Sequence, residues 1–164
     1  MKFSIRHAVD VPPAQAMAAY ASPAFYEGRP ARDAIAVREV VGHEDLGDRV
    51  LMEVRFAFTG HLSAAARAVV DPHKLSWVTR SEIRLAAGRS SWVVLPDHYP
   101  DRLSASGTYR FEQGAGGPGT TVVEVEGELG VHLPIVGRSV ERVIVSGLRA
   151  YLEDEVASIA DFTT

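Results

Sequence analysis

Hydrophobic and polar residues alternate along most of this chain, which is the pattern of β-strands that bury one face. The first run spans residues 2–9, where Phe3, Ile5, His7 and Val9 share one side. A period of two with one apolar side predicts a strand that is half covered by a core. The same alternation predicts further strands at residues 34–41, 50–58, 75–85, 92–95, 102–112 and 123–133. These runs would form a sheet of about six to seven strands.

Turn-forming residues separate these runs and restrict how they connect. Residues 43–48 are expected to form the turn after the second strand. The segment 114–119, Gly-Ala-Gly-Gly-Pro-Gly, is predicted to be a hairpin loop and not a phosphate cradle, because neither a Lys-Ser/Thr pair nor a helix follows it. Residues 62–70 are ambiguous, since their alanines favour a helix whereas Val69 and Val70 favour a strand.

Two short helices are expected between the first and second strands. Pro13 fits the first turn of a helix over residues 14–20, where its missing N–H costs nothing. Ser22 followed by Pro23 then predicts the start of a second helix over residues 24–27. One strand followed by two short helices is an unusual order, and it narrows the choice of fold.

The C-terminal part of the chain has the period of a helix. After Pro134 the apolar positions are spaced three and four apart, which predicts one amphipathic helix of about 26 residues. At 1.5 Å per residue its length is ~40 Å, enough to span the domain. Charged residues fill the opposite face, where Glu153, Asp154 and Glu155 are expected to meet solvent. Gly147 lies on the apolar face, so the helix either packs closely on the sheet there or leaves room for something else.

These elements predict one α+β domain over residues 1–164. A strongly twisted antiparallel sheet can curl around a single long helix and so bury one face of each strand. The expected architecture is a helix grip, in which a curved antiparallel sheet wraps around the C-terminal helix.

This order of elements resembles the START-like (SRPBCC) helix-grip superfamily, which includes the birch pollen allergen, lipid-transfer domains and polyketide cyclases. More narrowly, residues 1–7, 70–84 and 133–141 resemble the bacterial domain-of-unknown-function family 2505. The resemblance covers essentially the whole chain. It implies a hollow between the sheet and the long helix that holds an apolar ligand. Because members of the superfamily differ widely in activity, the fold does not settle the function.

The composition narrows the function classes. The chain has 164 residues, 46% of them hydrophobic and 23% charged, as in an ordinary globular protein. Its 17 Lys and Arg against 21 Asp and Glu give a net charge of −4, which argues against a general nucleic-acid binder. The absence of cysteine excludes disulfides and thiolate catalysis. No apolar stretch approaches the ~20 residues that span a bilayer, so we expect a cytoplasmic location without stable membrane insertion.

The usual catalytic and metal-binding patterns are absent from the sequence. There is no Gly-x-Ser-x-Gly elbow, and Ser146 lies inside the long helix. The six histidines lack the spacing of a metal face, so neither a metal nor a cofactor is expected. His7 differs because it faces inward. It is expected to be a hydrogen-bonded core or rim residue, with a ligand contact or a general base as the alternative. The acidic positions 124, 126 and 128 are expected to face solvent and could pair with Arg80, Arg84 or Arg110.

Inward-facing aromatic residues and hydroxyls are the candidate ligand site. They supply an apolar lining with few polar groups, as a small-molecule cavity requires. Leu148 and Tyr151 on the long helix would form the opposite wall, and Ser81 would add a hydroxyl. The residues predicted to contact a ligand are His7, Phe56, Phe58, Trp77, Thr79, Trp92, Tyr109, Leu148 and Tyr151.

Three functions are therefore open. The favoured one is binding or transport of a hydrophobic small molecule or lipid, by sequestration and without catalysis. The alternative is a polyketide cyclase-, aromatase- or dehydratase-like enzyme that uses His7 or Tyr109 as acid or base. The third is an interaction module with no ligand, which could form a homodimer through an edge strand. That module would have inward aromatics that fill the space completely.

Overall fold

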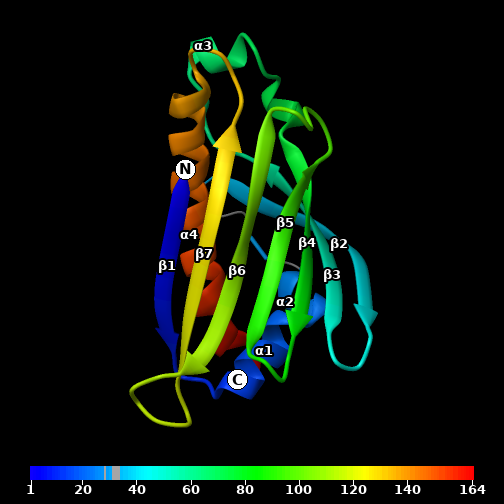
Figure 1. Ribbon diagram of the computed structural model, residues 1–164, viewed down its shortest axis with the longest axis vertical. Helices are drawn as coiled ribbons and strands as arrows, with labels where there is room; N and C mark the ends of the chain where they lie inside the picture. Colours follow the sequence, from blue (N-terminus) through cyan, green and yellow to red (C-terminus); the bar gives the residue numbers. More distant parts are fainter. Residues whose placement is uncertain (28, 31–33) are drawn as a thin grey trace.

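The computed structural model describes residues 1–27, 29–30 and 34–164, and in them seven strands form one curved antiparallel sheet. The strands are β1 (Lys2–Val9), β2 (Ile35–Asp45), β3 (Val50–Phe58), β4 (Ser76–Arg84), β5 (Arg89–Pro96), β6 (Leu103–Gln113) and β7 (Thr121–Val131). Their order is β1-β7-β6-β5-β4-β3-β2, so the first two strands of the chain are the two edges of the sheet (Figure 1).

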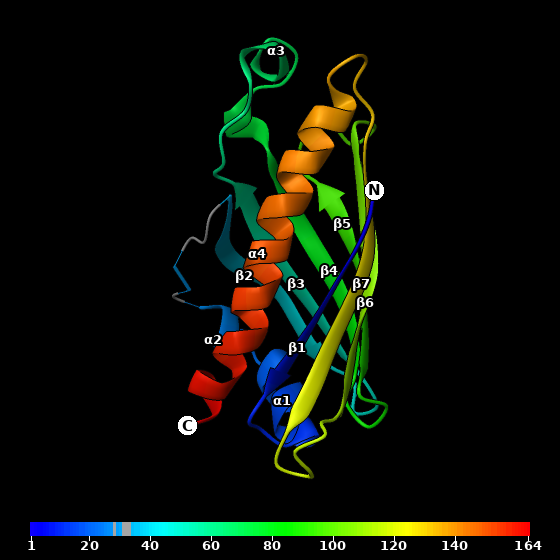
Figure 2. The ribbon, with the colours of Figure 1, turned by 90° about the vertical axis from the view of Figure 1, so that its left-hand side faces the viewer.

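The helices close the concave side of this sheet. They are α1 (Pro13–Tyr20), α2 (Pro23–Tyr26), α3 (Ala64–Arg67) and α4 (Gly137–Thr163), with a short 3-10 helix, η1 (Pro72–Lys74), before β4. Helix α4 runs along the sheet for most of its length, while α1 lies at one end and α3 at the other (Figure 2). The predicted helix grip is therefore confirmed, including the two short helices after the first strand.

The residues that were predicted to face inward on the strands are the ones that are buried. Every second residue of β3 from Val50 to Phe58 is buried, and the residues between them are half-buried. Phe56 lies opposite Trp77 in the β3–β4 register, and Ser81 lies opposite Trp92 in the β4–β5 register. The inward faces of neighbouring strands thus bring their large side chains together over the concave surface.

The turn expected at residues 43–48 begins later than predicted, while β5 (Arg89–Pro96) and β7 (Thr121–Val131) begin a few residues earlier than predicted. Strand β2 continues through His43 to Asp45, because His43 pairs with Met52 and the tighter turn starts only afterwards. In that turn the Asp45 carboxylate accepts a hydrogen bond from the Gly47 N–H at 2.8 Å, and Gly47 has the positive φ of 87° that glycine tolerates.

The ambiguous segment around residues 62–70 is resolved as a helix. The Ser63 hydroxyl accepts a hydrogen bond from the Ala66 N–H at 3.2 Å and so caps α3. Leu62, Ala66 and Val70 are buried one turn apart, whereas Val69 is exposed. Helix propensity therefore prevails over the β-preference of the valines, because the helical period buries one of the two.

Gly147 marks a close approach of α4 to the start of β2. A Cβ atom at this position would lie 2.5 Å from the Cβ of Ala34. Of the two explanations for a glycine on the apolar face, close packing is the one observed. The glycine thereby fixes how near the helix can lie to this edge of the sheet.

The outer face of the sheet carries charge pairs. Arg110 donates to Glu124 at 2.7 Å, and Glu126 lies 3.9 Å from the same guanidinium, as expected for a solvated acidic strip. Arg80 and Arg84 pair instead with Glu53 and Glu82. In the described part of the chain, no helix combines the length and apolar character needed to cross a bilayer.

Candidate functional site

A cavity lies between the concave face of the sheet and helix α4. Its volume is about 90 Å³, counted as the space open to the centre of a water molecule. Strands β2 to β7 supply one wall and α4 supplies the other. Eight predicted site residues line it: Phe56, Phe58, Trp77, Thr79, Trp92, Tyr109, Leu148 and Tyr151. Ser81 lines it as well.

His7 is the predicted site residue that does not line this cavity. It is half-buried on edge strand β1, where it pairs in register with Val123 of β7. Its inward orientation agrees with the strand period, but the edge of the sheet holds it away from the cavity wall. That position suits the interpretation of His7 as a rim residue of the core.

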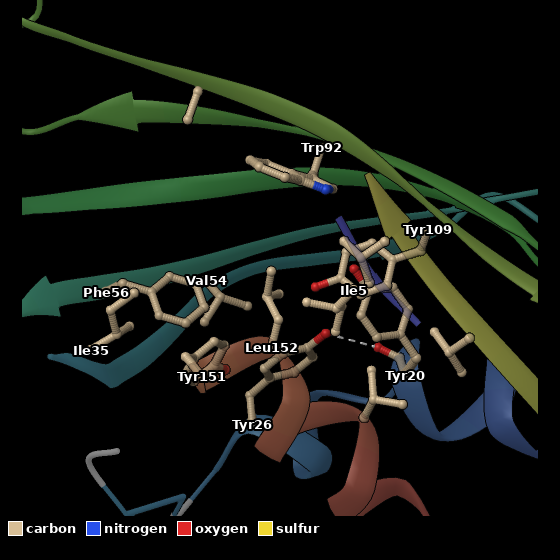
Figure 3. Close-up of a cluster of buried hydrophobic side chains, with 14 of the residues drawn as sticks. Ile5, Tyr20, Tyr26, Ile35, Val54, Phe56, Trp92, Tyr109, Tyr151 and Leu152 are labelled. Carbon is tan, nitrogen blue, oxygen red and sulfur yellow. Dashed lines mark hydrogen bonds between the residues drawn. The ribbon is translucent and has the colours of Figure 1, made fainter. Parts of the chain in front are cut away.

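Aromatic packing connects the two walls. Phe56 stacks on Trp77 of the neighbouring strand with ring centroids 6.0 Å apart and planes 15° apart. The same Phe56 ring meets Tyr151 of α4 edge-to-face at 5.5 Å. Figure 3 shows Phe56 and Tyr151 reaching toward one another from the sheet and the helix. These rigid rings therefore join the sheet side of the cavity to the helix side.

Trp92 forms part of the sheet-side wall and depends on two glycines. A Cβ atom at Gly107 would lie 2.5 Å from Cζ2 of the indole, and one at Gly127 would lie 2.9 Å from the same atom. The two glycines therefore let the indole lie flat against β6 and β7. The indole N–H has no hydrogen-bond partner among the described residues.

The buried end of the cavity holds a polar group of residues that we call the tyrosine–glutamate cluster: Tyr20, Tyr26, Tyr109, Tyr151 and Glu155. The Tyr109 hydroxyl donates a hydrogen bond to Oε2 of Glu155 at 2.9 Å. The Tyr26 hydroxyl donates to the main-chain oxygen of Tyr20 at 3.2 Å (Figure 3). Five side chains from α1, α2, β6 and α4 thus converge on one point.

Glu155 corrects the expectation that the acidic run of α4 faces solvent. Its exposed fraction is 3%, whereas Glu153 is exposed. The physical reason is the helical period, because Glu155 lies one turn after Tyr151 and one turn before Ile159, which are both buried. The sequence contained this signal, but the two acidic neighbours of Glu155 obscured it.

Burial changes the acid–base behaviour of the cluster. Removal from water raises the pKa of Glu155 to about 7, although the nearby Arg29 guanidinium and the hydrogen bond from Tyr109 both act to lower it. Burial also raises the pKa of Tyr20, Tyr26, Tyr109 and Tyr151, and the charge of Glu155 adds to the effect. All four phenols therefore keep their protons at neutral pH and can donate hydrogen bonds.

Arg29 flanks the cluster from the segment between α2 and β2. It forms an ion pair with Asp154 at 3.1 Å, and its guanidinium lies 5.0 Å from the ring centroid of Phe25 and 5.7 Å from that of Tyr151. The sequence pattern did not indicate a role in the site for Arg29, Tyr20 or Tyr26. Nothing local distinguishes them, because their proximity to Glu155 arises only when α1 and α2 pack against α4.

The other end of the cavity is polar and exposed. Lys74 of η1 and His98 and Arg102 of the β5–β6 connection line it. Arg102 donates to the main-chain oxygen of Val69 at 2.9 Å and so ties this connection to the segment that follows α3. Among the residues that the structure describes, no group of three or more histidine and carboxylate side chains could hold a metal ion.

Comparisons with known proteins agree with this architecture. The family model described as a protein of unknown function (DUF2505) matches residues 4–162. The Zhui aromatase/cyclase from Streptomyces sp. R1128 has a TM-score of 0.66 at 11% identity, over 99% of this chain and 94% of that one. A START superfamily protein from Mycobacterium smegmatis scores 0.56 at 14% identity, over 94% and 96% of the two chains. Norcoclaurine synthase from Thalictrum flavum scores 0.58 at 15% identity, over 95% and 84%.

No curated protein matches this chain in sequence. At these identities the structural likenesses show the fold alone, and that fold is the START-like helix grip expected from the order of the elements.

Proposed function

Since this chain belongs to the family described as proteins of unknown function (DUF2505), whose fold here is a START-like helix grip, we propose that it binds a hydrophobic small molecule or lipid between the sheet and α4. The observation that carries the proposal is the cavity itself, with its largely aromatic and aliphatic walls. Burying an apolar ligand there contributes about 25 cal/mol per Å² of apolar surface removed from water.

The size of the cavity favours a ligand over an interaction module with a solid core. A single buried water needs ~10–15 Å³ of such space, and the cavity offers about 90 Å³. Apolar walls around a space of this size make fewer dispersion contacts than the walls of a close-packed core. A bound apolar molecule restores those contacts. The exposed end beside Lys74 and Arg102 supplies the route of entry.

Acid–base catalysis is a second candidate, and one observation favours it. Glu155 is a titratable group on the cavity wall whose pKa is raised to about 7, where a general acid or base works best at neutral pH. Tyr109 is its hydrogen-bond partner. Because His7 lies outside the cavity wall, the acid–base roles in an enzyme would belong to Glu155 and Tyr109.

Native mass spectrometry of the purified protein, followed by denaturing extraction, tests the binding proposal. We expect either a co-purifying apolar molecule or, in protein freed of it, saturable binding of one 1-anilinonaphthalene-8-sulfonate per chain. A clean mass of the free chain together with no saturable binding of this probe would overturn the proposal. Turnover of an added apolar carbonyl compound that is lost in Glu155→Gln would instead favour the enzyme.

A further inference from the structure

Two polar groups in the cavity wall lack hydrogen-bond acceptors although they are buried. The Nε1–H of Trp92 and the O–H of Tyr151 donate no hydrogen bond of acceptable geometry to any described residue. Arg29 lies close to the Tyr151 oxygen, but a guanidinium can only donate, so it leaves the phenol O–H without an acceptor. Trp92 and Tyr151 are 7% and 3% exposed, so bulk water does not satisfy these two donors. Buried polar groups in native proteins are nearly always hydrogen-bonded, and an unpaired one calls for an explanation. A ligand that supplies the missing partner is such an explanation, because both residues line the cavity.

The position of Tyr151 relative to Glu155 indicates which chemical group of a ligand could pair with these side chains. The two residues are four positions apart on α4, so their side chains lie one above the other on the same face. Both line the cavity at its buried end. Tyr109 donates to Oε2 of the carboxyl group, and Tyr26 is its second phenolic neighbour. When Glu155 is neutral, its carboxyl group also carries a proton that it can donate. The protonated carboxyl group of Glu155 and the Tyr151 phenol are then two neighbouring hydrogen-bond donors.

We propose that the ligand carries a carbonyl oxygen, which accepts hydrogen bonds from the Tyr151 hydroxyl and the Glu155 carboxyl at the buried end of the cavity. This inference rests on the proposed ligand-binding function and names the chemical class of the ligand, a neutral apolar ketone or similar carbonyl compound. The unpaired indole N–H of Trp92 also calls for a hydrogen-bond acceptor on the ligand, because this group can only donate. Tyr109 is a positioning residue that holds the carboxyl group in place.

The charges around Glu155 argue for a neutral oxygen over an ion. Arg29 lies over the Tyr151 ring, so its guanidinium repels a cationic ligand group. An anionic group would meet the partial charge of Glu155 and of Asp154. The groups that face Glu155 are Tyr20 from α1, Tyr26 from α2, Arg29 from the segment before β2, Tyr109 from β6, and Tyr151 and Asp154 from α4 itself.

A pair of matched probes tests the inference on the unaltered protein. 2-Acetonaphthone presents a ketone on a naphthalene ring, and 2-ethylnaphthalene has nearly the same shape without the oxygen. We expect the ketone to bind about tenfold more tightly, as one or two buried hydrogen bonds imply. Its carbonyl stretch in the infrared should shift to lower wavenumber on binding. The ratio of the affinity for the ketone to that for the hydrocarbon should fall above about pH 7, because Glu155 loses its proton there. The affinity for the hydrocarbon should not change with pH.

Variants separate the two donors. Tyr151→Phe should lower the affinity for the ketone by about tenfold and leave that for the hydrocarbon unchanged. Glu155→Gln should keep a ketone preference, since the amide still donates, but lose its pH dependence. Ser146→Ala and Glu153→Gln, both on the exposed side of α4, are the controls and should change neither value.

The outcomes distinguish the two proposals. If ketone and hydrocarbon bind equally and the carbonyl stretch does not shift, the carbonyl inference is wrong while apolar binding stands. If no apolar molecule co-purifies and neither the two naphthalenes nor 1-anilinonaphthalene-8-sulfonate binds at any pH, both proposals are wrong.

Discussion

The hydroxyl of Tyr109 on β6 donates a 2.9 Å hydrogen bond to Oε2 of Glu155 on α4, 46 residues away in the sequence. Both side chains are buried, so the bond joins the sheet to the helix in a place that water does not reach. Charge and hydrogen bonding interact strongly in such a setting, because the local dielectric constant is low. The pKa of Glu155 and its response to changes at Tyr109 are therefore the quantities by which the tyrosine–glutamate cluster can be examined in solution.

Removing the Tyr109 hydroxyl should make Glu155 a weaker acid. The hydrogen bond from Tyr109 stabilises the carboxylate and lowers its pKa, so Tyr109→Phe should raise the pKa of Glu155 further above its value of about 7. The lost bond should also lower the free energy of unfolding by about 1–3 kcal/mol. A titration of the Glu155 carboxyl carbon by NMR measures the first effect, and urea unfolding measures the second. Tyr99→Phe, far from Glu155 at the exposed end, should leave this pKa unchanged; a pKa that falls in Tyr109→Phe contradicts the prediction.

The stability of the protein should depend on pH through Glu155. Its pKa is about 7 in the folded state, against 4.5 in the unfolded chain, so the folded state binds the proton more tightly. The resulting stabilisation is fully present below about pH 4.5 and is lost as the pH rises through about 7.

Comparison with Glu155→Gln isolates this effect. The free energy of unfolding of the native protein, relative to the variant, should fall on the order of 3 kcal/mol between about pH 4.5 and pH 8. Urea unfolding at several pH values measures the difference, and Glu153→Gln is the matched control because its carboxylate is exposed. A pH-independent difference between the native protein and Glu155→Gln would show that Glu155 titrates normally.

Gly147→Ala should destabilise the fold although alanine is the better helix former. The added Cβ would meet the Cβ of Ala34 at 2.5 Å, so α4 or the start of β2 has to move. Overpacking of this kind costs about 1–3 kcal/mol and outweighs the gain in helix propensity of about 1 kcal/mol. Thermal or urea unfolding measures the result. Ser146→Ala on the exposed side should be neutral or slightly stabilising, and an equal gain in both variants would disprove the close contact.

Filling the cavity from the helix side should abolish ligand binding without loss of the fold. Leu148 is a half-buried residue of α4 on the cavity wall, and Leu148→Trp places an indole in the space. We expect at least a tenfold loss of affinity for 1-anilinonaphthalene-8-sulfonate, since the ligand and the new ring compete for one volume. Leu51→Trp is the matched control, because Leu51 is half-buried on β3 and does not line the cavity. Equal affinities in the two variants would place the binding site elsewhere.

Local patterns along the chain were enough to predict the overall arrangement of the strands and of the long helix. The period of two along β3 and β4 assigned the inward faces, and the spacing from Val140 to Ile159 assigned the long helix. These patterns are reliable because each reflects one local fact, namely which side of an element meets the core. The same patterns point Phe56, Trp92 and Tyr151 inward, and all three line the cavity.

The chemistry at the buried end of the cavity could not be predicted in this way, because it arises from packing between distant segments. Glu155 is an ordinary acidic residue in the sequence, and its raised pKa exists because α1, α2 and β6 together exclude water from it. Tyr20, Tyr26 and Arg29 become its neighbours only when segments distant along the chain pack against α4. A local period tells which way one side chain points, whereas desolvation and pairing depend on what several elements bring to the same place.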